Sequence, residues 1–475
     1  MLEIIIPEKE LNFKSLEQNF YKKYCEMSCE AMKELLQMLD HKLQKERNKA
    51  VYRHKGHKET TIKTLMGEVT FSRTIYQVAD GSSKKKFVYL LDEYLNFETI
   101  GLISTNLAEK IVENATTTSY RKTAKNVSEL TGQTISHSGA WNIIQKLGKK
   151  VSDIEDEQVS LYRQNKLKSK GETKVLFEEA DGVYIKMQGK DRKISKSKEM
   201  RVAISYTGWE KISKNRYELS NKQVTCGFEK VVDFANKKDA KIASLYDPDE
   251  IDFRIFNSDG ATWLKKLHYS DETYFQLDKF HVKQAILRAN GDKDIQKNIT
   301  KLYENEEIDE MFKVILAYAE SVESEKEKAK LTELYTYLKN NEAGLIKYQS
   351  RISKLPTPPD GLEYRNLGTC EHNVDLVVAR RMKNNGTSWS SVGASNLAKL
   401  IALKASGELS KTLEKISKIV LPEAATRDII TILSAGRVQK TVGKGFESKT
   451  ASVLSNNKKL HNLLDFRDFS DIKFQ

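Results

Sequence analysis

Hydrophobic and polar positions follow two different periods along this 475-residue chain. Apolar residues recur with helical spacing in 1–50 and 102–151, whereas short β-prone runs dominate 174–277. We predict strands at 174–187, 199–206, 217–228, 253–256 and 274–277, and helices at 229–245 and 261–268. Three strands, a helix, a strand, a helix and a strand form the order of an RNase H-like core. The pattern therefore predicts an α/β protein with an α-rich N-terminal region.

The same pattern divides the chain into six segments. They are a helical region with a β-hairpin (1–100), a helix-turn-helix-like region with its linker (101–165), the first part of the core (166–282), an all-helical insertion (283–364), the last part of the core (365–405) and a basic tail (406–475). The insertion should contain helices at 283–289, 294–305, 308–322 and 325–339. The hairpin is expected at 61–78, and a polar linker at 152–172.

Apolar stripes on the predicted helices indicate their packing faces. In the first helix the stripe consists of Phe20, Tyr24, Met27, Ala31, Leu35 and Leu39. In the helix pair at 119–131 and 137–150, joined by a turn that begins at Gly132, the packing positions are Ala124, Val127, Leu130, Ile135, Trp141 and Ile144. We expect the first stripe to pack in a core or a dimer.

The second helix of that pair has the polar composition of a DNA-reading helix. Asn142, Gln145 and Lys146 would lie on its outer side, where they suit contacts with base edges in the major groove. Helix pairs joined by a glycine turn also occur in plain bundles, so packing without DNA is the alternative.

Composition adds a preference for polyanionic partners. The net charge is +13, 31% of residues are charged, and basic residues cluster at 42–63 and after 405. The four cysteines have neither zinc-site nor disulfide spacing, and the chain shows no signal peptide and no long apolar span. We therefore expect a cytoplasmic, nucleoid-associated protein that has no membrane partner.

Acidic residues interrupt the predicted strands. Glu179 and Asp181 share one face of the first core strand, and Glu178 faces the other way. Asp259 and Asp278 each follow the end of a later strand. A carboxylate in an apolar strand is costly unless it is paired, hydrated or bound to a cation. Taken alone, each strand-end Asp could equally be a turn former or a helix N-cap.

Five motifs in a fixed order carry a family resemblance. They are Ala-Asp181-Gly, Ser-Asp259-Gly-Ala-x-Trp263, Leu-Asp278-x-Phe-His281, Gly368-x-x-Glu371-His-Asn-Val-Asp375 and Arg381-Met-Lys-x-x-Gly386-x-Ser-Trp389-Ser-x-x-Gly393-Ala. Together they resemble the ISLre-two family of bacterial insertion-sequence transposases, which is similar to the wider Mutator-like group of DDE transposases. The resemblance covers nearly the whole chain.

The resemblance implies a site and its partners. Asp181, Asp259 and Glu371 would be the catalytic, metal-binding acids of an RNase H-like core. Asp278 and His281 match an accessory motif, which we expect to position the site or the DNA without binding metal. The implied substrate is double-stranded DNA, at transposon ends and target, and the protein is expected to be a homo-oligomer.

Basic residues after the last acid extend this site. Arg380, Arg381 and Lys383 are expected to hold DNA phosphates. Two Mg²⁺ or Mn²⁺ ions, about 3.5–4 Å apart, are the expected cofactors. In phosphodiester cleavage one ion activates the attacking oxygen, and the other stabilises the leaving oxygen. Oxygen ligands suit these hard ions.

The expected function is therefore metal-dependent DNA cleavage and strand transfer by a DDE transposase. The alternative is an inactive or domesticated relative that binds DNA without cutting it. A nuclease for RNA/DNA hybrids on the same core is a third hypothesis, which the helix-turn-helix and the insertion disfavour.

Overall fold

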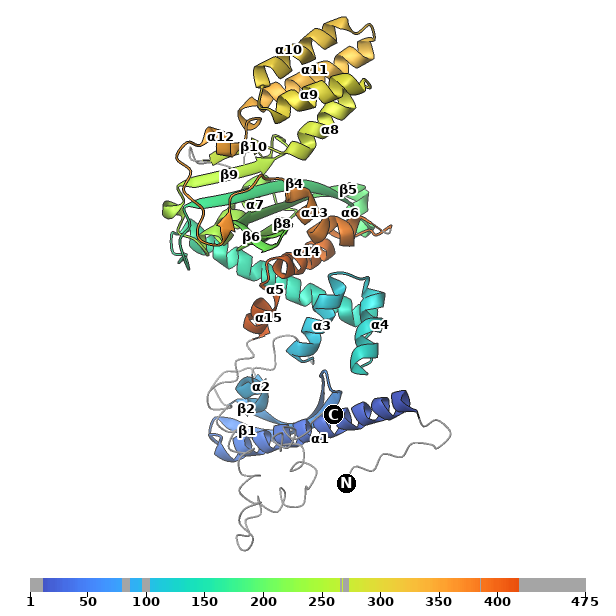
Figure 1. The fold of residues 1–475 in the computed structure, drawn as a ribbon. Coiled ribbons are helices and arrows are strands. Elements are labelled where there is room, and N and C mark those ends of the chain that lie inside the picture. The colour runs from blue at the N-terminus through green and yellow to red at the C-terminus, as the bar shows by residue number, and fades with distance from the viewer. Residues whose placement is uncertain are drawn as a thin grey trace, which may run out of the picture. The chain divides into compact units, whose positions relative to one another are not determined.

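The computed structural model describes residues 12–78, 86–95, 103–264, 267, 273–384 and 386–417 (Figure 1). The chain forms two compact units, Met1–Leu147 with Ser410–Gln475, and Gly148–Leu409. Both helices and strands are present, as the α/β prediction requires. The predicted tail from 418 onward lies outside the described residues.

A long helix against an antiparallel sheet forms the first part of the first unit. Its elements are α1 (Phe13–Glu46), β1 (Tyr52–Lys63), β2 (Glu68–Val78), β3 (Lys86–Val88) and α2 (Leu90–Leu95). The paired strands β1 and β2 confirm the predicted hairpin. Leu36 and Leu39 of α1 pack with Phe71 of β2, whereas Phe20 and Tyr24 are 50% and 45% exposed. The predicted apolar stripe of α1 is therefore buried only in its second half.

The rest of the first unit is helical. It contains α3 (Thr105–Ala115), α4 (Tyr120–Thr131), the start of α5 (His137–Arg163) and nearly all of α15 (Leu409–Ser417). The Ser119 hydroxyl accepts a hydrogen bond from the Lys122 N–H, and Gly132, with a φ of +66°, ends α4 in the left-handed region. This confirms the predicted helix pair. Two predicted packing positions are wrong, because Leu130 and Trp141 are 69% and 44% exposed.

The linker predicted at 152–172 is helical as far as Arg163, because α5 continues through it. Its polar composition predicts a solvated linker, but some of its polar side chains pair with other residues of the second unit. Lys399, only 2% exposed, donates to the Ser152 hydroxyl at 2.9 Å and to the Glu155 carboxylate at 2.7 Å. A buried lysine on α14 (Ser391–Ala405) therefore stabilises this part of the helix.

A five-stranded mixed sheet forms the centre of the second unit. Its order is β10 (Thr273–Leu277), β9 (Phe253–Ser258), β4 (Val175–Lys186), β5 (Ser197–Tyr206) and β8 (Gln223–Gly227). The strand β5 is antiparallel to both β4 and β8, while β4, β9 and β10 are parallel. The helix α7 (Val231–Ala243) connects β8 to β9. Parallel strands β4, β9 and β10 thus present their carboxyl ends at one edge.

One detail of the predicted sheet is wrong. The strand predicted at 217–228 is broken by Asn221, whose φ of +53° turns the chain. It becomes β7 (Arg216–Ser220) and β8, and β7 joins β6 (Gly208–Ser213) and β11 (Leu362–Glu363) in a separate sheet. The helix predicted at 261–268 is turn-like at 261–264, and most of its remainder lies outside the described residues.

The insertion is helical, as predicted. It consists of α8 (Lys279–Ala289), α9 (Lys293–Glu304), α10 (Ile308–Ser321) and α11 (Glu325–Asn340), which share a core that includes Ile286, Ile299 and Leu334. Shorter helices in this unit are α6 (Gly189–Ile194) and α12 (Tyr348–Arg351).

The helix predicted after Glu371 is also present. It begins as α13 (Cys370–Val374), continues as a π-helix at Asp375–Lys383, and is followed by α14 (Ser391–Ala405). The helices α13 and α7 cover opposite faces of the sheet, because Glu179 of β4 accepts from the Cys370 N–H of α13 and the next residue, Ala180, packs with Phe234 of α7.

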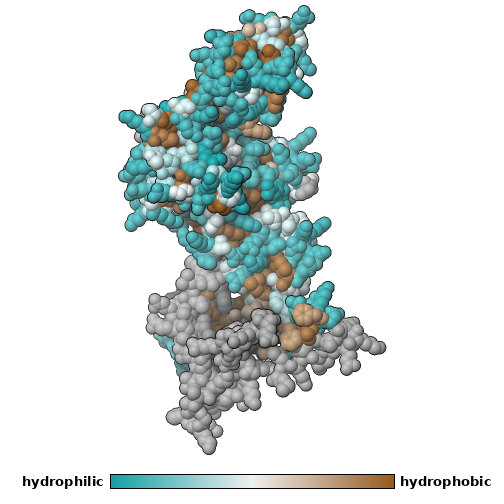
Figure 2. Space-filling view, viewed as in Figure 1, coloured by the Kyte–Doolittle hydropathy of each residue, from teal (hydrophilic) through white to brown (hydrophobic). Residues whose placement is uncertain are grey.

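Hydrophilic residues cover most of the coloured surface in Figure 2. Among the helices of the described residues, none combines the length and apolar character needed to cross a membrane.

Candidate metal centre

Alternating side chains of β4 give the central sheet two chemically different faces. Glu178 and Ala180 face α7, where Ala180 packs in an apolar cluster with Phe234. Glu179 and Asp181 face the side covered by α13. This arrangement confirms the predicted alternation and directs Asp181 toward the segment that carries Glu371.

Three predicted site residues meet at this face. One ligand atom each from Asp181, His281 and Glu371 lies within 4.8 Å of the other two, which is close enough for a shared metal ion. They come from β4, from the first turn of α8 and from the first turn of α13. Asp181 and His281 are half-buried and Glu371 is exposed, so the group is open to solvent on one side.

Asp259 lies outside this group of three. It follows β9, and its Oδ1 accepts a hydrogen bond from the Ala261 N–H at 2.8 Å. Gly260 has a φ of +81°, and a Cβ there would lie 2.4 Å from Asn341 Oδ1, so this turn needs glycine. The Tyr337 hydroxyl of α11 donates to the Asp259 carbonyl at 2.9 Å. The insertion therefore helps to hold the turn that presents the Asp259 carboxylate.

Asp278 has a structural role that the sequence left open. It is the N-cap of α8, and its Oδ1 accepts from the Phe280 and His281 N–H groups at 2.8 and 3.3 Å. Asp278 is buried, with only 5% of its surface exposed. Because a cap fixes the first helical turn, Asp278 orients the backbone of His281.

The electrostatics of the group favour a cation. Burial raises the pKa of Asp181 to about 6, and the negative charges of Asp259 and Glu371 add to this effect. A 2.6 Å hydrogen bond from the Gly182 N–H and the nearby His281 oppose the rise in pKa. Two carboxylates and an imidazole fit Mg²⁺ or Mn²⁺, and the imidazole suits Mn²⁺ better.

Two polar residues of this face received no role from the sequence: Glu179, whose place beside Asp181 was predicted, and Asn257. Both are almost fully buried, at 0% and 1% exposure, and they hydrogen-bond to each other at 2.8 Å. The signal for Glu179 was present, because a second carboxylate two residues before Asp181 shares its face. The signal for Asn257 was absent, since an Asn in a β-prone run has many structural explanations.

The predicted DNA-contact residues differ in their availability. Asn142 and Lys146 are exposed on α5, and Gln145 is half-buried. Arg380 and Lys383 are exposed on the π-helix. Arg381 is only 8% exposed, and its guanidinium lies 4.9 Å from the centre of the Trp389 ring. Its charge stacks on Trp389 inside the unit, so Arg381 is less available to a DNA phosphate than Arg380 and Lys383 are.

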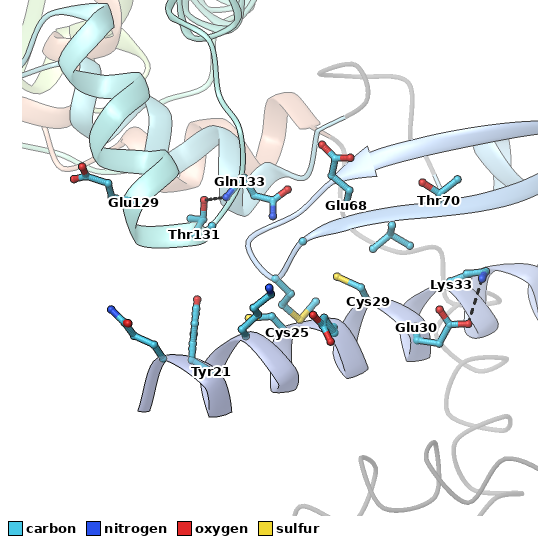
Figure 3. Close-up of a pocket in the computed structure, with 17 residues that line it drawn as sticks. Tyr21, Cys25, Cys29, Glu30, Lys33, Glu68, Thr70, Glu129, Thr131 and Gln133 are labelled. Carbon is cyan, nitrogen blue, oxygen red and sulfur yellow. Dashed lines mark hydrogen bonds and ion pairs between the residues drawn. The ribbon is translucent and has the colours of Figure 1, made fainter. Parts of the chain in front are cut away.

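The first unit contains a cavity of about 730 Å³ between α1, the hairpin turn and the end of α4 (Figure 3). Tyr21, Cys25 and Cys29 of α1 line one side, and Thr131 and Gln133 line another. Burial raises the pKa of the Cys29 thiol, and the nearby Cys25 raises it further. A raised pKa keeps the Cys29 thiol protonated, which is the opposite of what an activated nucleophile needs.

The chain belongs to the uncharacterised protein family UPF0236, whose family model matches residues 7–418. It is 24% identical over 436 residues to "UPF0236 protein TTE0610/TTE0881/TTE1053/TTE2432" of Caldanaerobacter subterraneus subsp. tengcongensis, covering 86% of this chain and 85% of that protein. A second similar protein of that organism carries eleven such designations in its name and is 24% identical over 384 residues, with 80% and 74% coverage. "UPF0236 protein in vanSb 3'region" of Streptococcus gallolyticus is 26% identical over 351 residues, 72% of each chain. Members of the family therefore occur in multiple copies in one genome.

Proposed function

We propose that this UPF0236 member is a DDE-type transposase that cuts DNA and transfers strands with divalent metal ions. The observation that carries the proposal is the meeting of Asp181, His281 and Glu371 at one face of the central sheet. The sheet order and strand directions support an RNase H-like core. The resemblance to the ISLre-two family, and the multiple copies of relatives in one genome, agree with a mobile element.

Four residues of the chain would have distinct roles in such a site. Asp181 and Glu371 would hold a divalent cation together with His281, and Asp259 would complete the acidic set at the end of β9. Two bound cations would supply Lewis-acid activation of the attacking oxygen and stabilisation of the leaving oxygen. Glu371, exposed in the first turn of α13, is the acid that an incoming phosphodiester can approach.

DNA binding is the second part of the proposal. The net charge of +13 favours a polyanion, and the exposed Asn142 and Lys146 are suited to reach base edges from α5. Arg380 and Lys383, exposed on the π-helix that follows Glu371, would hold phosphates near the cutting site. Oligomerisation into a dimer or a larger assembly would pair two ends.

The test of catalysis is a nicking assay on DNA that contains the flanks of the gene, with Mg²⁺ or Mn²⁺. Asp181→Asn, Asp259→Asn and Glu371→Gln should each abolish cleavage and leave DNA binding within about twofold, because only the metal ligands are changed. His372→Gln, an exposed neighbour outside the metal group, is the matched control and should cut normally. Wild-type protein that binds the ends but cuts nothing supports the inactive relative instead.

The test of recognition is a competition gel shift at fixed salt. Changing Asn142 and Gln145 to Ala in the full chain should cost about 1–3 kcal/mol per lost base contact and flatten the preference for end DNA over scrambled DNA. A preference that survives in the double variant would make α4 and α5 packing helices.

A further inference from the structure

We infer that Glu179 is a positioning residue that sets the distance between Asp181 and Glu371. This inference rests on the proposed metal site but concerns a side chain that does not itself belong to it. Glu179 is 0% exposed, so neither substrate nor bulk solvent reaches its carboxylate.

The Glu179 carboxylate is surrounded by hydrogen-bond donors from three other segments. They are the Tyr206 hydroxyl (2.6 Å), the Asn257 amide (2.8 Å), the Thr369 hydroxyl (2.6 Å), and the N–H groups of Gly368 (3.2 Å), Thr369 (3.0 Å) and Cys370 (3.1 Å). Among the described residues these partners carry no full charge. The carboxylate is therefore stabilised by directed hydrogen bonds, which fix geometry more strictly than an ion pair does.

Glu179 and its hydrogen-bond donors at 368–370 each lie next to a proposed metal ligand in the sequence. On β4, Asp181 follows Glu179 by two residues on the same face, which is a spacing of about 6.5–7 Å. On the other side, Thr369 and Cys370 immediately precede Glu371. The hydrogen bonds from 368–370 thus attach the start of α13 to β4 at the position where Glu371 comes opposite Asp181.

The same arrangement extends to His281 through Asn257. The Asn257 Nδ2 donates to Glu179 Oε2 and to Asp278 Oδ2, both at 2.8 Å. Asp278 in turn caps α8 and accepts from the His281 N–H at 3.3 Å. One connected chain of buried polar groups therefore supports all three members of the metal group from behind.

A neutral amide cannot replace this carboxylate. Gln at position 179 would keep the volume, but it would offer one acceptor oxygen and turn an N–H₂ group toward the N–H groups of 368–370. The start of α13 would then shift away from β4, and Glu371 would shift with it. The lost hydrogen bonds should lower stability as well, so the defect that identifies a positioning role is the loss of metal affinity.

The experiment measures Mn²⁺ binding by electron paramagnetic resonance on the full-length protein, with melting temperature beside it. Glu179→Gln should weaken Mn²⁺ binding by about 10–100-fold, as the loss of groups behind metal ligands typically does. The matched control is Glu178→Gln, an adjacent and equally buried carboxylate on the other face of β4. It should lower the melting temperature while Mn²⁺ affinity stays within about twofold of wild type.

A milder variant covers the case in which Glu179→Gln does not fold. Thr369→Val removes one hydroxyl donor to Glu179 and leaves the three backbone donors in place. It should weaken Mn²⁺ binding about 2–10-fold, with a smaller fall in melting temperature than Glu179→Gln causes. Folded Glu179→Gln, or Thr369→Val in its place, with wild-type Mn²⁺ affinity overturns the positioning role. Wild-type affinity in Asp181→Asn as well would instead reject the proposed metal site.

Discussion

The two faces of β4 treat buried carboxylates in opposite ways. On the α7 face, Glu178 pairs with Lys238, and Arg254 lies 3.4 Å away. Although burial lowers the pKa of Lys238, the carboxylates of Asp239 and Glu178 raise it above its ordinary value. On the α13 face, Asp181 has two further acids near it, and its pKa is raised to about 6.

The difference separates a structural charge from a functional one. Glu178 has its compensating cation built into the chain, so the α7 face is complete as folded. Asp181 and its acidic neighbours carry negative charge that the surrounding residues compensate only in part. A face with uncompensated negative charge is stabilised by binding a divalent cation. For this reason Asp181, and not Glu178, belongs to the proposed site.

The largest expected change in stability comes from removing the cation that neutralises Glu178 on the α7 face. Lys238→Met removes the buried cation and leaves the buried Glu178 with only the more distant Arg254, at 3.4 Å, so the free energy of unfolding should fall by about 3–5 kcal/mol. Urea unfolding at neutral pH measures this. Lys174→Met is the matched control, since its ion pair with Glu250 is about half exposed and should contribute little to stability. A similar small loss for both lysines would mean that the α7 face is not maintained by this charge pair.

On the α13 face, removing a charged side chain is expected to raise the free energy of unfolding instead of lowering it. Because the folded protein raises the pKa of Asp181 from 3.8 to about 6, stability falls as the pH rises from about 4 to 6. Asp181→Asn removes this cost and should raise the free energy of unfolding of the metal-free protein at pH 7.5, by at most about 3 kcal/mol. The gain should vanish toward pH 4.

Thermal melts in a chelator at both pH values give the measurement. Mg²⁺ or Mn²⁺ should then raise the melting temperature of the wild type and leave that of Asp181→Asn almost unchanged, because binding to the folded state stabilises it. A less stable Asp181→Asn variant at pH 7.5 would show that the carboxylate is fully compensated within the fold.

Local pattern predicted much of this molecule because the signals involved are short-range. The hairpin, the four long insertion helices and the alternation of Glu178 with Glu179 follow from periodicity alone. The break at Asn221 did not, since a single left-handed residue leaves the surrounding β-prone pattern intact.

Long-range partners account for what the sequence could not give. Glu179 finds its donors in Thr369 and Cys370, about 190 residues later in the chain. Arg381 resembles its exposed neighbour Arg380 in sequence, and only the position of Trp389 distinguishes them. His281 was expected to stay out of the metal's ligand set, and its nearness to Asp181 and Glu371 depends on how α8 begins beside β4.

A third prediction tests His281 on the α13 face. Since its ring belongs to the group within 4.8 Å, His281→Ala should raise the Mn²⁺ concentration for half-maximal cleavage by about tenfold, which corresponds to about 1.4 kcal/mol. His372→Ala, which changes an exposed imidazole next to Glu371 but outside that group, should leave the half-maximal concentration unchanged. A slower rate with an unchanged Mn²⁺ midpoint in His281→Ala would return His281 to a role in positioning alone.

The smallest effect concerns the charge that the α13 face presents to DNA. Arg380 has 60% of its side chain exposed and pairs with Asp375 at 2.7 Å. Because exposed ion pairs contribute little, Arg380→Ala should change the free energy of unfolding by less than about 1 kcal/mol. The same change should weaken DNA binding without regard to sequence, and should reduce the slope of log affinity against log salt by about 0.9 if one phosphate contact is lost.

Arg216 provides the matched control for this measurement, because it is also an exposed arginine, with 69% of its side chain exposed and a carboxylate partner, Glu218, at 2.6 Å. It lies on β7 in the separate sheet, so Arg216→Ala should leave the salt slope unchanged. Fluorescence anisotropy of labelled end DNA over a range of salt concentrations separates the two variants. Equal slopes for wild type and Arg380→Ala would show that the π-helix after Glu371 does not contact the DNA backbone through this residue, and phosphate binding at that face would then depend on Lys383.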